Sequence, residues 1–195
     1  MKRAARLAWL AVGLGLATWT VASAPRDAAA ARGTLASRLL GPFAPLAAAI
    51  EWGRFDAAAG AGEEGRAWKH ADRALRLAPA DPRGWTFLAH HAIYELGNPR
   101  RTPDAAERRR AVELGLAILA RGEREARSPG PAAFKAGVVH LSMAQQDDAE
   151  RWLPISRRAA WLRAAEAFER AALAGEPVAA EAARLARAAA QAEDG

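Results

Sequence analysis

A Pro-Ala-Asp-Pro turn between two amphipathic segments constrains the fold of this chain more than any other feature. Residues 73–78 end one helical pattern, residues 79–82 form the turn, and Trp85 begins the next apolar pattern. Proline is tolerated in the first turn of a helix but not in its interior, so the two helices must end and restart here. A helix that ends in Ala-Leu-x-Leu-x-Pro and restarts a few residues later is how helical-hairpin repeats join, and the sequence therefore predicts a junction between two helical hairpins.

The composition supports an all-α fold. Alanine, leucine and arginine dominate and aromatic residues make up 7% of the chain, which favours helix over sheet. The net charge is +6, and 25 of the 28 basic residues are arginine, as expected from a GC-rich genome. Because the arginines alternate with acidic residues, we interpret them as solvated helix faces; a nucleic-acid or anionic-lipid surface is the alternative. The chain has no cysteine, which excludes disulfides and thiolate chemistry.

The N-terminus predicts a membrane anchor over residues 1–24. A short basic start precedes an uncharged segment, Leu7–Ala24, whose 18 residues are just long enough to span a bilayer. An Ala-Ser-Ala sequence at its end resembles a signal cleavage site, but Pro25 follows it. We therefore expect an uncleaved, single-pass anchor in a bacterial inner membrane, with the helical domain on the extracytoplasmic side. Secretion after signal cleavage is the alternative.

Residues 25–37 read as a linker, and residues 38–192 as the helical domain. Pro45 suits the first turn of a helix, and the glycines at 60 and 62 suit its end because glycine adopts a left-handed cap without penalty. Asp104 with Glu107 predicts a capped helix start. We expect hairpins at about 45–79, 82–129 and 131–175, and a capping helix at 177–192.

One stretch carries a family resemblance. Its residues are Gly62, Ala67, Ala71, Ala74 and Pro79, followed in the next helix by Trp85, Leu88 and Ala89. Their types and spacing resemble the tetratricopeptide repeat (TPR) family. The resemblance implies a short array of antiparallel helical hairpins, a TPR-like α-solenoid, behind the N-terminal transmembrane helix.

The chain departs from a regular TPR array in two ways. Its closing prolines, Pro79, Pro129 and Pro177, are 50 and 48 residues apart, against a TPR period of about 34. Glu51 and Arg54 stand where the family has an aromatic residue and a leucine. The resemblance is therefore to a divergent array with inserted turns between helices.

The resemblance implies a binding groove on the exposed face of each first helix. The matching positions are Arg83, Thr86, His90, Tyr94, Lys135, Val139 and Ser142. Peptide or C-terminal carboxylate recognition would use Arg83 and Lys135 as charge partners. We expect a membrane-anchored scaffold that binds an unidentified protein or peptide, with no catalysis, cofactor, metal, nucleic acid or small-molecule substrate.

Two motifs suggest other chemistry. Residues 60–65 spell the dinucleotide fingerprint G-x-G-x-x-G, but a predicted helix precedes it and two glutamates lie within it, so a helix–helix turn is the better interpretation. His90, His91 and Glu95 could contribute to a metal-dependent enzyme, which is the alternative function. However, adjacent histidines point about 100° apart on a helix, and no H-E-x-x-H motif occurs.

Overall fold

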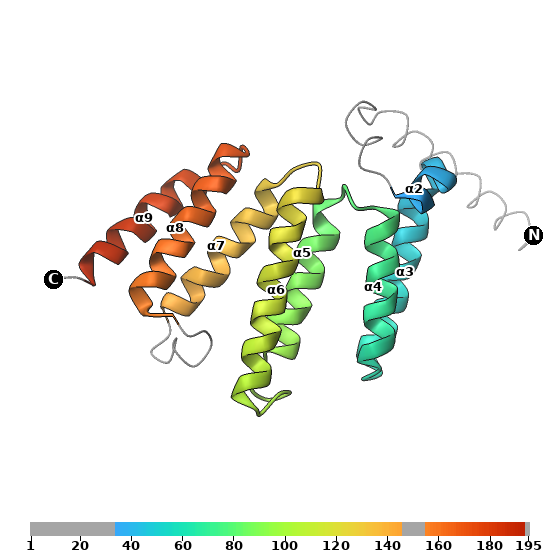
Figure 1. The fold of residues 1–195 in the computed structure, drawn as a ribbon, viewed down its shortest axis with the longest axis horizontal. Helices are drawn as coiled ribbons and strands as arrows, with labels where there is room; N and C mark the ends of the chain where they lie inside the picture. Colours follow the sequence, from blue (N-terminus) through green and yellow to red (C-terminus); the bar gives the residue numbers. More distant parts are fainter. Residues whose placement is uncertain (1–33, 146–154, 194–195) are drawn as a thin grey trace, which may run out of the picture. The chain divides into compact units, whose positions relative to one another are not determined.

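The computed structural model describes residues 34–145 and 155–193, which divide into two compact units, one ending at Ala78 and one beginning at Pro79 (Figure 1). The described residues form helices and contain no strand, which confirms the all-α prediction. The predicted anchor over residues 1–24 lies outside the described residues. Among the helices of the described part, none is both long enough and apolar enough to cross a bilayer.

The first unit is built on one helical hairpin. A short helix α2 (Leu35–Leu40) and a 3-10 turn η2 (Gly41–Phe43) lead into α3 (Ala44–Gly60), which packs against α4 (Glu64–Leu77). The first hairpin was expected at about 45–79. The buried residues of both helices are mostly alanines, with Phe55 and Leu75 as the large apolar side chains. Small residues at this interface let the two helices approach closely.

The turn between α3 and α4 occupies the stretch that spells G-x-G-x-x-G. Gly62 has a φ of +76°, a conformation that favours glycine, and the amide of Glu63 donates to the carbonyl of Ala58 at 2.9 Å. A helix precedes the turn and another follows it, so the interpretation as a helix–helix turn is confirmed. The strand that a dinucleotide site needs does not precede it.

A buried polar network replaces part of the apolar contact between α3 and α4. The Glu51 carboxylate contacts His70 Nδ1 at 2.7 Å and accepts from Arg54 Nη1 at 2.6 Å. Glu51 and His70 are both buried. The hydrogen bond from His70 holds the pKa of Glu51 below its ordinary value, with Arg54 acting in the same direction and burial opposing both. The departure of Glu51 from the apolar TPR pattern is therefore matched by a partner on the facing helix.

The second unit contains the remaining helices. They are α5 (Pro82–His90), the π-helix η3 (His91–Leu96), α6 (Ala105–Glu125), α7 (Gly130–Ala144), α8 (Arg157–Leu173) and α9 (Ala179–Ala192). α5 and η3 pack on α6, α7 packs on α8, and α9 covers α8, while α7 also contacts α5 and α6. The expected positions were 82–129, 131–175 and 177–192. Asp104 caps α6 by accepting from the amides of Ala106 and Glu107, so the predicted helix start is confirmed.

Two glycines permit close contacts in the core of the second unit. A Cβ atom on Gly122 of α6 would lie 2.7 Å from Cβ of Trp85 on α5, and one on Gly137 of α7 would lie 2.6 Å from the ring of Phe168 on α8. Both aromatic side chains are fully buried. The helix pairs are thus packed at a separation that only a residue without a side chain allows.

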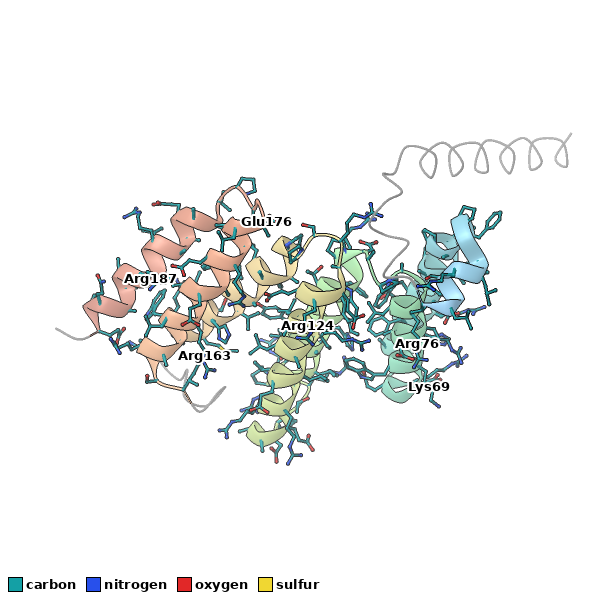
Figure 2. The ribbon with its side chains drawn as sticks, turned by 45° about the horizontal axis from the view of Figure 1, so that its top comes forward. Lys69, Arg76, Arg124, Arg163, Glu176 and Arg187 are labelled. Atoms are coloured by element: carbon teal, nitrogen blue, oxygen red, sulfur yellow. The ribbon has the colours of Figure 1, made fainter. Side chains whose placement is uncertain are left out.

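Ion pairs link helices at the surface of the second unit. Arg170 of α8 makes a bidentate contact with Glu123 of α6 at 2.9 and 3.2 Å, and Arg187 of α9 does the same with Glu169 of α8 at 2.6 and 2.7 Å. Figure 2 labels Arg187 among the side chains of this part of the unit. Since these arginines are about half exposed, each pair contributes little to stability, and the apolar core carries the fold.

Candidate functional site

The first part of the site is the N-terminus of α5, whose contacts fix the direction of this helix. Asp81 caps this helix by accepting from the amide of Arg83 at 3.0 Å, and Pro82 occupies its first turn. The indole of Trp85 is buried and donates to the carbonyl of Pro79 at 2.8 Å. The guanidinium of Arg121 lies 5.1 Å from the centre of the same indole ring. These contacts fix the direction of α5 and therefore the face that it presents to α7.

A π-helical segment extends α5 and brings two aromatic rings together. In η3 the amide of Gly97 donates to the carbonyl of Ala92, five residues earlier, at 3.1 Å. The rings of His90 and Tyr94 lie 4.7 Å apart between centroids, at an interplanar angle of 41°. Single π-turns within α-helices are frequent at functional sites. The candidate site is therefore centred on this segment.

Lys135 of α7 reaches these two rings. Its Nζ lies 3.5 Å from His90 Nδ1 and 5.0 Å from the centre of the Tyr94 ring. The second contact is a cation–π interaction. Among the described residues, no carboxylate lies within ion-pair distance of Lys135. Within the part of the chain that the structure describes, the site therefore presents a cation that no carboxylate neutralises.

The electrostatics of the site keep His90 neutral. Burial lowers the pKa of His90, and the positive charge of Lys135 lowers it further, while Glu95 acts in the opposite direction. A neutral imidazole can accept a hydrogen bond at Nδ1, which matches the position of the Lys135 ammonium. Burial raises the pKa of Tyr94, although a hydrogen bond with Ser142 counteracts it. Lys135 is therefore the charge that the site offers at neutral pH.

A pocket of about 240 Å³ adjoins this cluster between η3, α6 and α7. Its lining is mostly apolar, with a few polar groups at its edge. The lining residues are Ile93, Tyr94, Gly97, Asn98, Pro99, Val112, Val139, Ser142 and Met143. The hydroxyl of Ser142 donates to the carbonyl of Val138 at 2.9 Å, which is a bond within the helix rather than a nucleophile–base pair. The arrangement suits an apolar side chain next to an anionic group.

The structure brings five of the seven predicted groove residues together. Tyr94, Val139 and Ser142 line the pocket, while His90 and Lys135 stand beside Tyr94. Val139 was expected on the exposed face of its helix, and this was wrong, because it is 1% exposed and belongs to the core. It faces inward because α7 packs against other helices on several sides, which leaves little of its surface to solvent.

The other two predicted residues lie nearer the start of α5. Arg83 has a 90% exposed side chain that pairs with Asp81 at 3.1 Å. The Thr86 hydroxyl contacts the carbonyls of Pro82 and Arg83 at 3.2 and 3.1 Å, within its own helix. Unlike Lys135, Arg83 thus has a local carboxylate partner. Arg83 and Lys135, which were both predicted to bind a carboxylate of the peptide, therefore have different electrostatic surroundings.

Sequence reasoning missed the loop side of the pocket. Gly97, Asn98 and Pro99 belong to a break after η3 that the TPR pattern does not contain, and Met143 lies four residues after Val139 on α7. The four-residue spacing from Val139 was a usable signal for Met143. No local pattern indicates that the loop folds against the pocket.

The described residues place no further ligand beside the alternative metal site at His90, His91 and Glu95. His91 is buried and His90 is occupied by Lys135. In residues 34–145 and 155–193, no group of three or more His, Cys, Asp or Glu side chains is placed to hold a metal ion.

His140, on α7, is a separate titratable group. Burial, together with the positive charges of Arg163 and Arg170, lowers its pKa to about 4. Its Nδ1 is buried and has no hydrogen-bond partner among the described residues. The imidazole is therefore neutral at pH 7 and contributes to packing rather than to the charge of the site.

Comparison of the chain with protein-family models, with curated proteins and with solved structures gave no match in any of the three.

Proposed function

We propose that this chain is a membrane-anchored, TPR-like scaffold whose second unit binds a peptide segment of another protein without catalysis. The observation that carries the proposal is the position of Lys135 beside the Tyr94 ring at the edge of an apolar pocket, where the described part of the chain offers it no carboxylate partner. The hairpin order of the second unit and the TPR-like residues around Pro79 support a repeat architecture. Residues 1–24 would anchor the scaffold, with its helices on the extracytoplasmic side.

Each part of the site has a role in this proposal. The pocket receives one apolar side chain of the peptide, since 240 Å³ is enough for a leucine or phenylalanine. Lys135 binds a carboxylate, preferably the C-terminal one, because no carboxylate of the described chain competes for it. Arg83 and Thr86 extend the same helix face toward the N-terminus of α5. Arg83 must leave Asp81 to bind a ligand, so we assign it the smaller contribution.

The test uses the full chain in detergent micelles and an immobilised library of short peptides. Each peptide is presented with a free C-terminal carboxylate and, separately, as the C-terminal amide. We expect retained peptides to carry a large apolar residue at or next to the C-terminus, and to lose binding on amidation. Removing the cation by Lys135→Met should weaken binding by about tenfold or more, since a hydrogen bond to a charged group contributes about 1.5–3 kcal/mol.

The matched control is Lys69→Met. Lys69 lies on α4 in the first unit (Figure 2), is exposed, and undergoes the same chemical change. We expect this variant to bind like the unaltered chain. The proposal is wrong if no peptide is retained, or if the two lysine variants bind equally well.

A further inference from the structure

The N-terminal part of the first unit exposes several large apolar side chains. Among the described residues of α2, η2 and the first half of α3, six large apolar side chains are exposed, and we call them the α2–α3 apolar surface. They are Leu35, Leu39, Leu40, Phe43, Leu46 and Ile50. Leu39 is 79% exposed and Leu35 is 75% exposed. Single exposed apolar residues are ordinary on a soluble protein, but six within sixteen residues form a patch that indicates an interaction.

The inward contacts of the same segment are made by polar and small residues. The Thr34 hydroxyl donates to the carbonyl of Arg76 at the end of α4 at 2.5 Å, and Thr34 also caps α2 by accepting from the amide of Ser37 at 3.2 Å. At the start of α3 the buried residues are Ala44 and Ala48. No residue of α2 is buried. The leucines of α2 therefore take no part in a buried core, although Thr34 ties the segment to α4, and such exposed leucines suit an apolar surrounding on the outer side.

The position of this surface along the chain identifies what covers it. Ten residues separate the end of the uncharged segment at Ala24 from Leu35, and ten extended residues reach about 35 Å at most. If residues 7–24 span a bilayer, the chain connection holds the α2–α3 apolar surface within that distance of the membrane boundary. Residues 28–50 contain two arginines, Arg32 and Arg38, and no acidic residue. Positive charge without negative charge favours contact with anionic lipid headgroups.

We propose that the α2–α3 apolar surface lies in the headgroup region of the bilayer and fixes the orientation of the first unit on the membrane. This inference rests on the membrane anchoring proposed above. Leu35, Leu39 and Phe43 insert among the upper acyl chains, in the manner of an interfacial helix, and Arg38 contacts lipid phosphates. The first unit is thereby held against the membrane rather than suspended on a free linker.

The absence of cysteine makes a direct test possible. Single cysteines are introduced into the full chain at Leu39 and at Leu46, and the matched control is Leu173→Cys in α8, an exposed apolar position of the second unit. Each variant carries an environment-sensitive fluorophore and is reconstituted into vesicles of phosphatidylethanolamine and phosphatidylglycerol. Flotation shows whether the chain is bound to vesicles. Quenching by aqueous iodide and by spin-labelled lipid reports where the label lies.

We expect the labels at positions 39 and 46 to be quenched by spin-labelled lipid and shielded several-fold from iodide, with blue-shifted emission. The control label should remain open to iodide. The double variant Leu35→Glu/Phe43→Glu should restore iodide access at position 46 without loss of helicity, since both side chains are exposed. Failure of the chain to float overturns the anchoring and this inference together, whereas the peptide-binding proposal is tested independently in detergent.

Two results with vesicle-bound chain overturn the inference alone. Iodide access at positions 39 and 46 equal to that of the control shows that the surface faces water. Shielding from iodide without quenching by spin-labelled lipid shows that protein covers it, either residues 7–24 of the same chain or a second copy. A dependence of that shielding on the protein-to-lipid ratio distinguishes the second copy.

Discussion

Replacing Gly137 by alanine tests the packing of α7 against α8. The new Cβ would lie 2.6 Å from two ring atoms of Phe168 and 2.9 Å from a third, whereas carbon atoms in contact are normally about 3.5–4.0 Å apart. The ring cannot easily move, because it is 1% exposed and the ring of Phe134 lies 5.3 Å away between centroids. We therefore expect the second unit to lose stability.

The net effect combines two opposing contributions to the free energy of unfolding. Alanine in a helix interior is favoured over glycine by about 1 kcal/mol. Overpacking a core costs about 1–3 kcal/mol, and the confined Phe168 ring places this site in the upper part of that range. Gly137→Ala should therefore destabilise the second unit by about 1–2 kcal/mol. Hydrogen exchange of the α7 and α8 amides in the full chain measures this value for the second unit alone.

Two further variants isolate the cause. Ala188→Gly changes an exposed residue of α9 and calibrates the backbone contribution, which should be at most about 1 kcal/mol. Phe168→Leu removes the ring atoms that the new methyl group would meet. The free energy of unfolding of the double variant, Gly137→Ala with Phe168→Leu, should exceed the value expected from adding the two single effects by about 1 kcal/mol or more. This account of the packing is wrong if Gly137→Ala stabilises the unit, or if the two substitutions act additively.

Three other substitutions have defined outcomes. Because His70 lowers the pKa of Glu51 below its ordinary 4.5, the carboxylate stabilises the first unit above pH 4.5. This stabilisation is lost as the pH falls through the pKa of Glu51 in the folded state. Glu51→Gln should therefore reduce the loss of helicity at acid pH that circular dichroism measures. His140, whose pKa falls from 6.5 to about 4 on folding, should make the second unit less stable by up to about 3 kcal/mol as the pH falls between these values. His140→Leu should abolish that slope in hydrogen exchange at several pH values, and an unchanged slope would contradict the assignment. Trp85→Phe should cost about 1–3 kcal/mol in the same exchange measurement by leaving the carbonyl of Pro79 without its donor, and equal exchange rates would exclude this role.

Local signals account for the helix boundaries that were predicted well. Proline at positions 82 and 131, an Asp cap at 104 and a left-handed glycine at 62 act through the geometry of adjacent residues, so the sequence alone is enough to place them. The π-helical segment at His91–Leu96 carries no such signal. The four-residue spacing of His90 and Tyr94 already puts their rings on one face of a helix, but the change to a π-helix could not be predicted from a 3.6-residue period.

The residues of the candidate site came from the TPR resemblance. The groove positions that it implies include Tyr94, Lys135 and Ser142, which the structure places at or beside the pocket. The resemblance placed Val139 on the exposed face of its helix as well, although Val139 is buried, because spacing along one helix does not specify how many neighbours surround that helix.

The all-helical fold, the turns and the placement of charged residues follow from the sequence, since these features depend on contacts within a few residues. Tertiary packing was needed to establish that Lys135 has no carboxylate partner among the described residues and lies beside an apolar pocket, and that Leu39 is exposed while the Thr34 hydroxyl bonds to the end of α4. Both facts depend on which helices pack together and at what distance. In the second unit, that distance is set in part by glycines such as Gly137, which meet side chains far away in the chain.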